Sequence, residues 1–137
     1  MSKPLTDRPV LLAVEPQVYV TDLERAIAYF AGALGFEVAF RYGEPVHYGQ
    51  VVRDGVRINL RHLDEPLVPP EVMAREPDLI CASIHVSDAK RLFDEYAAAG
   101  AVFHQRLECA AWQPPGTGGF IVRDPDGNLI HFAGPTG

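Results

Sequence analysis

The sequence predicts an α+β fold built from two βαβββ modules in tandem. One pattern carries most of this prediction: a short apolar strand, a hydroxyl–acid pair, an amphipathic helix and a terminating glycine. It occurs at residues 18–35 and again, sixty-six residues further on, at residues 84–100. An Asp-Gly turn follows each copy, at Asp54-Gly55 and at Asp126-Gly127. The length of 137 residues suits a single domain that holds both copies.

Module one is expected over about residues 12–62. Thr21 is followed three residues later by Glu24, which is a capping box, and it predicts a helix whose apolar stripe ends before Gly35. Asp54-Gly55 predicts a hairpin. The strands of this module are expected at residues 12–20, 36–42, 47–53 and 56–62.

A proline-rich linker, about residues 63–78, separates the modules and contains one helical turn around residues 71–75. Module two is expected over about residues 79–134, and Asp124-Pro125-Asp126-Gly127 turns its last hairpin. We interpret the Gly116-Thr117-Gly118-Gly119 run as a flexible flap over a pocket. The expected elements are a strand at 79–86, a helix at 88–99, a strand at 101–107, a loop at 108–119 and strands at 119–123 and 128–133.

Charge and hydropathy restrict the classes of partner. The 18 acidic and 12 basic residues give a net charge of −6 and no basic stripe for phosphates, which argues against nucleic-acid binding. No apolar run reaches the ~20 residues of a membrane span. There is no apolar signal-peptide segment either, so we expect a cytoplasmic protein without a membrane partner. Cys81 and Cys109 are then expected to be free thiols.

Strand periodicity separates the side chains that face the helices from those that face the other way. Alternate residues point to opposite faces of a strand, and the apolar set of each strand belongs on the helix side. The opposite faces are unusually polar for a surface that curls inward, which indicates a lined cavity. Their expected residues are Glu15, Gln17, Tyr19, Arg57, Asn59, Arg61, Cys81, Ser83, His85, Leu129, His131 and Ala133.

Four segments resemble the vicinal oxygen chelate superfamily, and within it the glyoxalase/bleomycin-resistance group. The resemblance extends from about Val14 to Phe132 and implies paired βαβββ modules, a cleft between curved mixed sheets, and usually a homodimer. The segments are Val18-Tyr19-Val20-Thr21-Asp22, Ala28-Tyr29-Phe30, Leu34-Gly35-Phe36 and Phe120-Ile121-Val122-Arg123-Asp124-Pro125-Asp126-Gly127-Asn128.

The resemblance also implies where a metal enzyme of this superfamily would hold its ion. Those positions carry Glu15, Asn59, Cys81 and His131, whereas the superfamily favours His or Gln on strands one and five and Glu on strands four and eight. Of these, Glu15, Cys81 and His131 could ligate zinc, but the set departs from the family pattern, so we expect no metal cofactor. Other roles remain open. Glu15 could pair with Arg57, His131 could hydrogen-bond Asn59 or Glu15, and Cys81 could fill the core.

Trp112 is the only tryptophan, and bleomycin-resistance proteins resemble this chain there, with a tryptophan that lines a drug groove. An aromatic ring on a loop can stack on planar or cationic ligands, or it can clasp a neighbouring subunit. We therefore favour a binding protein that sequesters a planar or cationic small molecule in a dimer cleft without chemistry. The alternative is a metal-dependent lyase, isomerase or dioxygenase. The expected ligand-binding residues are Tyr48, Asn59, Arg61, Trp112 and His131.

Overall fold

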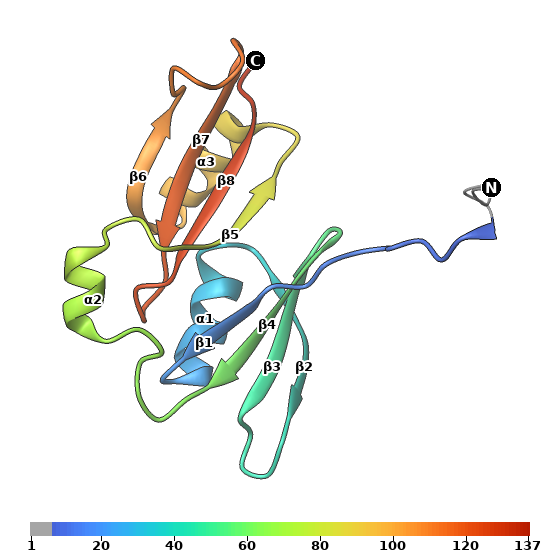
Figure 1. Cartoon of the computed structure of the whole chain (residues 1–137), viewed down its shortest axis with the longest axis vertical. Helices are drawn as coiled ribbons and strands as arrows, with labels where there is room; N and C mark the ends of the chain where they lie inside the picture. The colour runs from blue at the N-terminus through green and yellow to red at the C-terminus, as the bar shows by residue number, and fades with distance from the viewer. Residues whose placement is uncertain (1–6) are drawn as a thin grey trace.

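The computed structural model describes residues 7–137, which form two four-stranded mixed sheets with a helix packed on each (Figure 1). The first sheet has the order β1-β4-β3-β2 and the second the order β5-β8-β7-β6, so the two βαβββ modules are confirmed. The elements are β1 (Gln17–Val20), α1 (Leu23–Gly32), β2 (Glu37–Tyr42), β3 (Tyr48–Arg53), β4 (Val56–His62), α2 (Pro70–Arg75), β5 (Ile80–His85), α3 (Ala89–Ala98), β6 (Val102–Glu108), β7 (Thr117–Arg123) and β8 (Leu129–Pro135).

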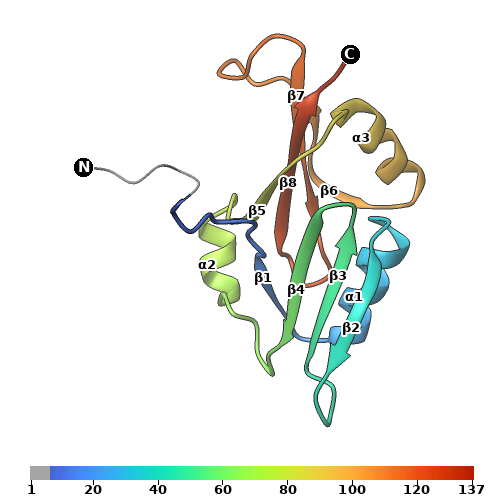
Figure 2. The same ribbon diagram turned by 90° about the vertical axis from the view of Figure 1, so that its right-hand side faces the viewer.

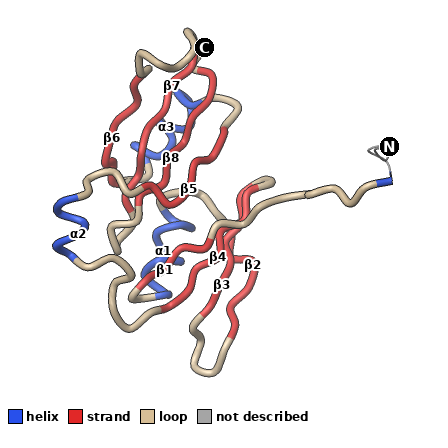
Figure 3. The backbone as a smooth tube through the Cα atoms, viewed as in Figure 1, coloured by secondary structure: helices blue, strands red, loops and turns tan. Residues whose placement is uncertain are grey.

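The first strand is shorter than predicted. Only residues 17–20 pair with β4, in the parallel register Gln17↔Asn59 to Val20↔His62. Residues 8–16, which we call the arm, have no strand assignment and lead away from the body of the molecule (Figure 3). The apolar run at 10–14 that suggested a longer strand is exposed. In the register of β1 with β4, Val14 would fall opposite Val56, the first residue of β4, and residues 10–13 would lie beyond the end of that strand.

The start of α1 also differs from the predicted capping box. Asp22 is the N-cap, and its Oδ1 accepts a hydrogen bond from the backbone N–H of Arg25 at 3.0 Å. Thr21 is not available as the cap because its hydroxyl donates to Asp126 at 2.6 Å. Glu24 instead accepts two hydrogen bonds from the Arg41 guanidinium of β2, at 2.8 and 2.9 Å. The helix begins where expected, but with a different cap.

The glycine run before the last hairpin is part of the second sheet and not a flap. Residues 117–119 pair with residues 133–135 of β8, so β7 begins at Thr117. A Cβ on Gly119 would lie 3.1 Å from the carbonyl oxygen of Phe132, and one on Gly118 would lie 3.2 Å from that of Glu108. Close backbone approach between strands therefore accounts for these glycines.

The helix-facing side chains of both sheets merge into one apolar core. Alternate residues of β1 and β4 are buried beneath α1, as the strand periodicity predicted, and those of β7 and β8 are buried beneath α3. Tyr96 of α3 stacks edge-on against Phe120 and Phe132, with ring centroids 6.0 and 5.4 Å apart. Among residues 7–137, no strand pairs the first sheet with the second, so side-chain contacts join the modules. This shared core is the first such feature, and beside it Arg53 of β3 forms an ion pair with Glu95 of α3 at 2.6 Å.

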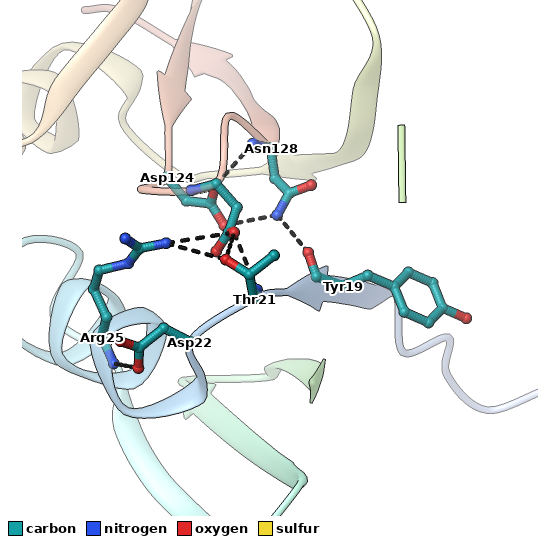
Figure 4. A network of polar contacts seen from close by, with 7 residues as sticks. Tyr19, Thr21, Asp22, Arg25, Asp124 and Asn128 are labelled. Carbon is teal, nitrogen blue, oxygen red and sulfur yellow. Dashed lines mark hydrogen bonds and ion pairs between the residues drawn. The ribbon is translucent and has the colours of Figure 1, made fainter. Parts of the chain in front are cut away.

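The second feature is a set of hydrogen bonds that we call the inter-module clasp, formed by Asn128 and Asp126 with the start of module one (Figure 4). Asn128 donates from Nδ2 to the carbonyl oxygen of Tyr19 at 2.9 Å, and Asp126 accepts from both the N–H and the hydroxyl of Thr21, at 3.0 and 2.6 Å. Asp124 is buried and shapes the turn by accepting from the backbone N–H groups of residues 126 and 128. Desolvation raises the pKa of the Asp124 carboxyl despite these hydrogen bonds.

Both helices lie on the same side of their sheets. In the view of Figure 1, α1 and α3 lie behind the strands, so the two helix-free faces are turned toward the viewer, and Figure 2 shows the same arrangement from the side. The linker helix α2 lies to the left of the strands in Figure 1, near the level at which the two modules meet, and it covers the residues where the sequence predicted a helical turn. Among residues 7–137, no helix has the length and apolar character needed to cross a membrane.

Candidate functional site

The helix-free face of the first sheet carries a polar cluster centred on Gln50, which is only 7% exposed. Its Nε2 donates to Glu15 Oε1 at 3.1 Å and to Asn59 Oδ1 at 2.8 Å, and its Oε1 accepts from Arg57 at 2.9 Å. Asn59 also donates to Glu15, at 3.3 Å. The suggested direct pair of Glu15 with Arg57 is therefore wrong, because each of these side chains meets Gln50 instead. We call these four residues the Gln50 cluster.

Aromatic rings and a second arginine lie beside the Gln50 cluster. Tyr48 is paired with Arg61 across β3 and β4, and Tyr19 is paired with Arg61 across β1 and β4, so all three share the helix-free face. Phe40 stacks on Tyr48 with ring centroids 6.0 Å apart and an interplanar angle of 24°. Arg61 is exposed. This part of the face offers flat rings and a guanidinium to a ligand, and both can stack on a planar group.

The helix-free face of the second sheet carries His131. Its Nδ1 lies 3.2 Å from the hydroxyl of Ser83 on the neighbouring β5. The ring packs over β7 at Gly119, where a Cβ would lie 2.8 Å from His131 Nε2. Desolvation, and secondarily the charge of His85, lowers the pKa of His131, so the ring is neutral at pH 7. The suggested hydrogen bond from His131 to Asn59 or Glu15 is not formed, because those two side chains lie on the first sheet and His131 lies on the second.

Cys81 is exposed at the start of β5, and its expected role as a core filler is wrong. Its sulfur lies 3.8 Å from Asn128 Oδ1, within reach of a weak hydrogen bond. Partial desolvation of the sulfur raises the pKa of the thiol, so Cys81 is protonated near pH 7. Both cysteines are free thiols, as predicted.

The side chains that the resemblance suggested as metal ligands do not lie together in the described part of the chain. In the described part of the chain, no three His, Cys, Asp or Glu side chains lie close enough together to hold an ion. Glu15 belongs to the Gln50 cluster on the first sheet, whereas Cys81 and His131 belong to the second. A site for an ion that used all three would therefore have to combine groups from different sheets.

The predicted ligand-binding residues fall into three places. Tyr48, Asn59 and Arg61 share the helix-free face of the first sheet, and His131 lies on that of the second. Trp112 is 79% exposed on the loop between β6 and β7. Its role as a ligand contact or a subunit contact stays a prediction.

Gln50 is the site residue that the sequence analysis missed. Pairing back from the Asp54-Gly55 turn puts residue 53 opposite 56 and residue 50 opposite 59, which is the register observed. This count places residue 50 beside the predicted site residue Asn59. Val51 is buried on the helix-facing side of β3, so alternation along the strand places Gln50 on the helix-free face.

Two βαβββ modules, each a four-stranded mixed sheet with a helix packed on one face, define the class of α+β fold to which this chain belongs. The model of the Glyoxalase/Bleomycin resistance protein/Dioxygenase superfamily matches residues 12–132, and the chain belongs to that family. The comparison with curated proteins finds no match.

Solved structures share this fold at low sequence identity. One is the bleomycin-binding protein from bleomycin-producing Streptomyces verticillus in complex with copper(II)-bleomycin, with a TM-score of 0.67, 23% identity, and coverage of 95% of this chain and 99% of that one. Another is the bleomycin resistance determinant encoded on the transposon Tn5, with a TM-score of 0.67, 15% identity, and coverage of 91% and 98%. A family member from Alicyclobacillus acidocaldarius has a TM-score of 0.69 at 19% identity, with 89% of each chain covered.

Proposed function

We propose that this protein is a small-molecule-binding protein of the bleomycin-resistance type, which sequesters a planar or cationic ligand without chemistry. The observation that carries the proposal is the composition of the helix-free face of the first sheet. It combines stacked rings at Phe40 and Tyr48, an exposed guanidinium at Arg61, and polar side chains held in place by Gln50. Binding sites typically join apolar or aromatic walls to a few fixed polar groups in this way.

A second copy of the chain completes the site in this proposal. The helix-free faces of both modules look to the same side (Figure 1), and in the single chain they expose polar side chains such as Arg57, Arg61 and Ser83. A partner related by a two-fold axis would present the same faces in return, because such an interface is self-complementary. The cleft would then have walls from both copies, and the acidic net charge of −6 favours a cationic ligand over an anionic one.

The test is a calorimetric titration of the intact protein with metal-free bleomycin, followed in parallel by the fluorescence of Trp112. Tyr48→Ala and Arg61→Ala are each expected to weaken binding by about tenfold, as expected for anchors that stack on the ligand. Arg75→Ala is the matched control, because Arg75 is an exposed arginine on α2, outside both helix-free faces. Equal binding by all four proteins, or no binding by the parent, would remove the proposal.

Metal analysis separates this function from the metal-dependent alternative. Protein purified without chelator is expected to bind bleomycin equally well before and after exhaustive treatment with a chelator. A stoichiometric divalent ion that is lost in His131→Ala would instead support a lyase, isomerase or dioxygenase. In that case Glu15, Cys81 and His131 would be the ligands to test, drawn from two copies of the chain.

A further inference from the structure

One row of side chains crosses all four strands of the first sheet on its helix-free face. The pairings are Tyr19 with Arg61 between β1 and β4, Arg61 with Tyr48 between β4 and β3, and Tyr48 with Tyr42 between β3 and β2. Paired residues of neighbouring strands lie about 5 Å apart on the same face. Three phenol side chains and one guanidinium side chain therefore rise from adjacent positions, and we call these four residues the tyrosine–arginine row.

The guanidinium of this row has no counter-charge of its own. Arg61 is exposed, and in the part of the chain that the structure describes it forms no ion pair with a carboxylate. By contrast, Arg41 and Arg53 each pair with a glutamate, at 2.8 and 2.6 Å. The carboxylate of Glu15, on the same face as Arg61, already accepts hydrogen bonds from two amide side chains. Arg61 is therefore available to a negatively charged group of a ligand.

A tyrosine hydroxyl beside Arg61 also has a hydrogen to donate. Gln17 donates from Nε2 to the Tyr19 hydroxyl at 3.3 Å, and its Oε1 accepts from the Tyr48 hydroxyl at 3.5 Å. The single hydrogen of the Tyr48 hydroxyl is thus used by Gln17, whereas that of the Tyr19 hydroxyl is left for another acceptor. A guanidinium has five N–H donors and no acceptor. Arg61 and Tyr19 together form a set of donors, and an anionic group is the chemistry that such a set binds.

We propose that the tyrosine–arginine row binds a planar aromatic ligand through a carboxylate group. The carboxylate would accept hydrogen bonds from Arg61 and from the Tyr19 hydroxyl, because the planar fork of a guanidinium matches the two oxygens of a carboxylate. The aromatic part of the ligand would pack against Tyr48 and Phe40, whose rings are stacked on each other at the next positions of the same face.

The sign of this charge differs from that of the whole chain. The net charge of −6 acts on a ligand at long range and is screened by salt over about 8–10 Å. Arg61 acts at contact, where a charge-assisted hydrogen bond is about twice as strong as a neutral one. A basic group elsewhere on the ligand would keep the long-range attraction, so a cationic ligand of the proposed kind can also carry the carboxylate.

The test compares two ligands that share one ring system and differ in charge. Naphthoate carries a carboxylate on a planar bicyclic ring, and naphthamide carries an uncharged amide in the same place. In a calorimetric titration of the intact protein, naphthoate is expected to bind with a dissociation constant of about 0.1 mM. Naphthamide is expected to bind at least about tenfold more weakly. Equal affinity for the two ligands, or no binding of naphthoate, would overturn the proposal.

Variants of the row locate the anionic group. Arg61→Gln is expected to abolish the preference for naphthoate, and Arg61→Lys should retain part of it, because an ammonium keeps the charge but not the planar fork. Tyr19→Phe should weaken naphthoate binding by about fivefold and leave naphthamide binding unchanged. Arg75→Gln is the matched control, since Arg75 is exposed on α2, outside the helix-free faces. Urea unfolding confirms that each variant is folded. A preference that persists in Arg61→Gln would rule out the tyrosine–arginine row as the carboxylate site.

The inference rests on the proposed function, because it takes the helix-free face of the first sheet as the ligand site, but the two can fail separately. A protein that binds bleomycin and does not distinguish naphthoate from naphthamide would remove the carboxylate site alone. A protein that prefers naphthoate, loses this preference in Arg61→Gln and gives no calorimetric response to bleomycin would remove the bleomycin-type ligand and support the carboxylate site.

Discussion

Replacing Asp126 by alanine tests whether the clasp between the modules stabilises the fold. The Asp126 side chain is 9% exposed, and one of its oxygens accepts two hydrogen bonds from Thr21, at 3.0 Å from the backbone N–H and 2.6 Å from the hydroxyl. Arg25 lies 3.4 Å from the same oxygen and is half-exposed. Asp126→Ala removes the acceptor and leaves both donors of Thr21 without it.

The magnitude follows from these contacts. A hydrogen bond to a charged acceptor contributes about 1.5–3 kcal/mol, and the half-exposed ion pair with Arg25 adds less than about 1 kcal/mol. The second oxygen of Asp126 is buried without a hydrogen-bond partner, which offsets part of this gain. Asp126→Ala is therefore expected to lower the free energy of unfolding by about 2–3 kcal/mol, a shift of roughly 1–2 M in the urea midpoint.

The conservative variant Asp126→Asn separates the loss of the hydrogen bonds from the loss of the charge. Asp126→Asn retains the accepting oxygen and replaces the partnerless one, so its cost is expected to be about 1 kcal/mol or less. Thr21→Val removes only the hydroxyl, and in the background of Asp126→Ala it should cost almost nothing. Urea unfolding followed by circular dichroism measures all of these. An Asp126→Ala protein within about 0.5 kcal/mol of the parent, or an alanine and an asparagine variant of equal stability, would refute the reasoning.

The remaining predictions concern pH and the glycines of the sheet and helix. Desolvation, and then His85, lowers the pKa of His131 in the folded state. The unfolded chain therefore binds the proton first as the pH falls below about 6.5, stability falls with it, and His131→Gln should flatten this slope in urea unfolding from pH 7 to 5. Gly134→Ala would place a Cβ against the carbonyl oxygen of Val86, so it should cost about 3 kcal/mol or more by the same measurement. Gly32→Ala meets nothing within 4 Å at the end of α1 and should stabilise the protein by about 0.5–1 kcal/mol.

Most of the fold could be predicted because its signals are local. The repeat of strand, helix and glycine predicts two modules, and the Asp54-Gly55 turn sets the register of β3 and β4. Period-two alternation then assigns residues to the helix-free faces, as Asn59 and Arg61 show. The modules, the register of β3 with β4 and the face assignments depend only on the order and spacing of neighbouring residues, so they are predictable from the sequence.

Three features could not be predicted from the sequence, because they depend on contacts between segments that are far apart in the chain. The residues around Thr21 predict that it caps a helix, but its hydroxyl donates a hydrogen bond to Asp126, which is 105 residues away in the sequence. The apolar residues of the arm have the composition of a strand, yet in the register of β1 with β4 residues 10–13 would lie beyond Val56, where β4 begins. Gln50 becomes the centre of a polar cluster only when Glu15, Arg57 and Asn59 converge on it.

The turn at residues 124–128 makes hydrogen bonds within itself and also hydrogen bonds to module one. Asp124 forms the turn by accepting from two backbone N–H groups, and this leaves Asp126 and Asn128 free to reach module one at Thr21 and Tyr19 (Figure 4). Because no strand among residues 7–137 pairs the two sheets, their relative position depends on the shared core, on this clasp and on the ion pair of Arg53 with Glu95. Tyr19 lies on the face that carries the proposed ligand contacts, so the turn also holds one wall of the proposed site in place.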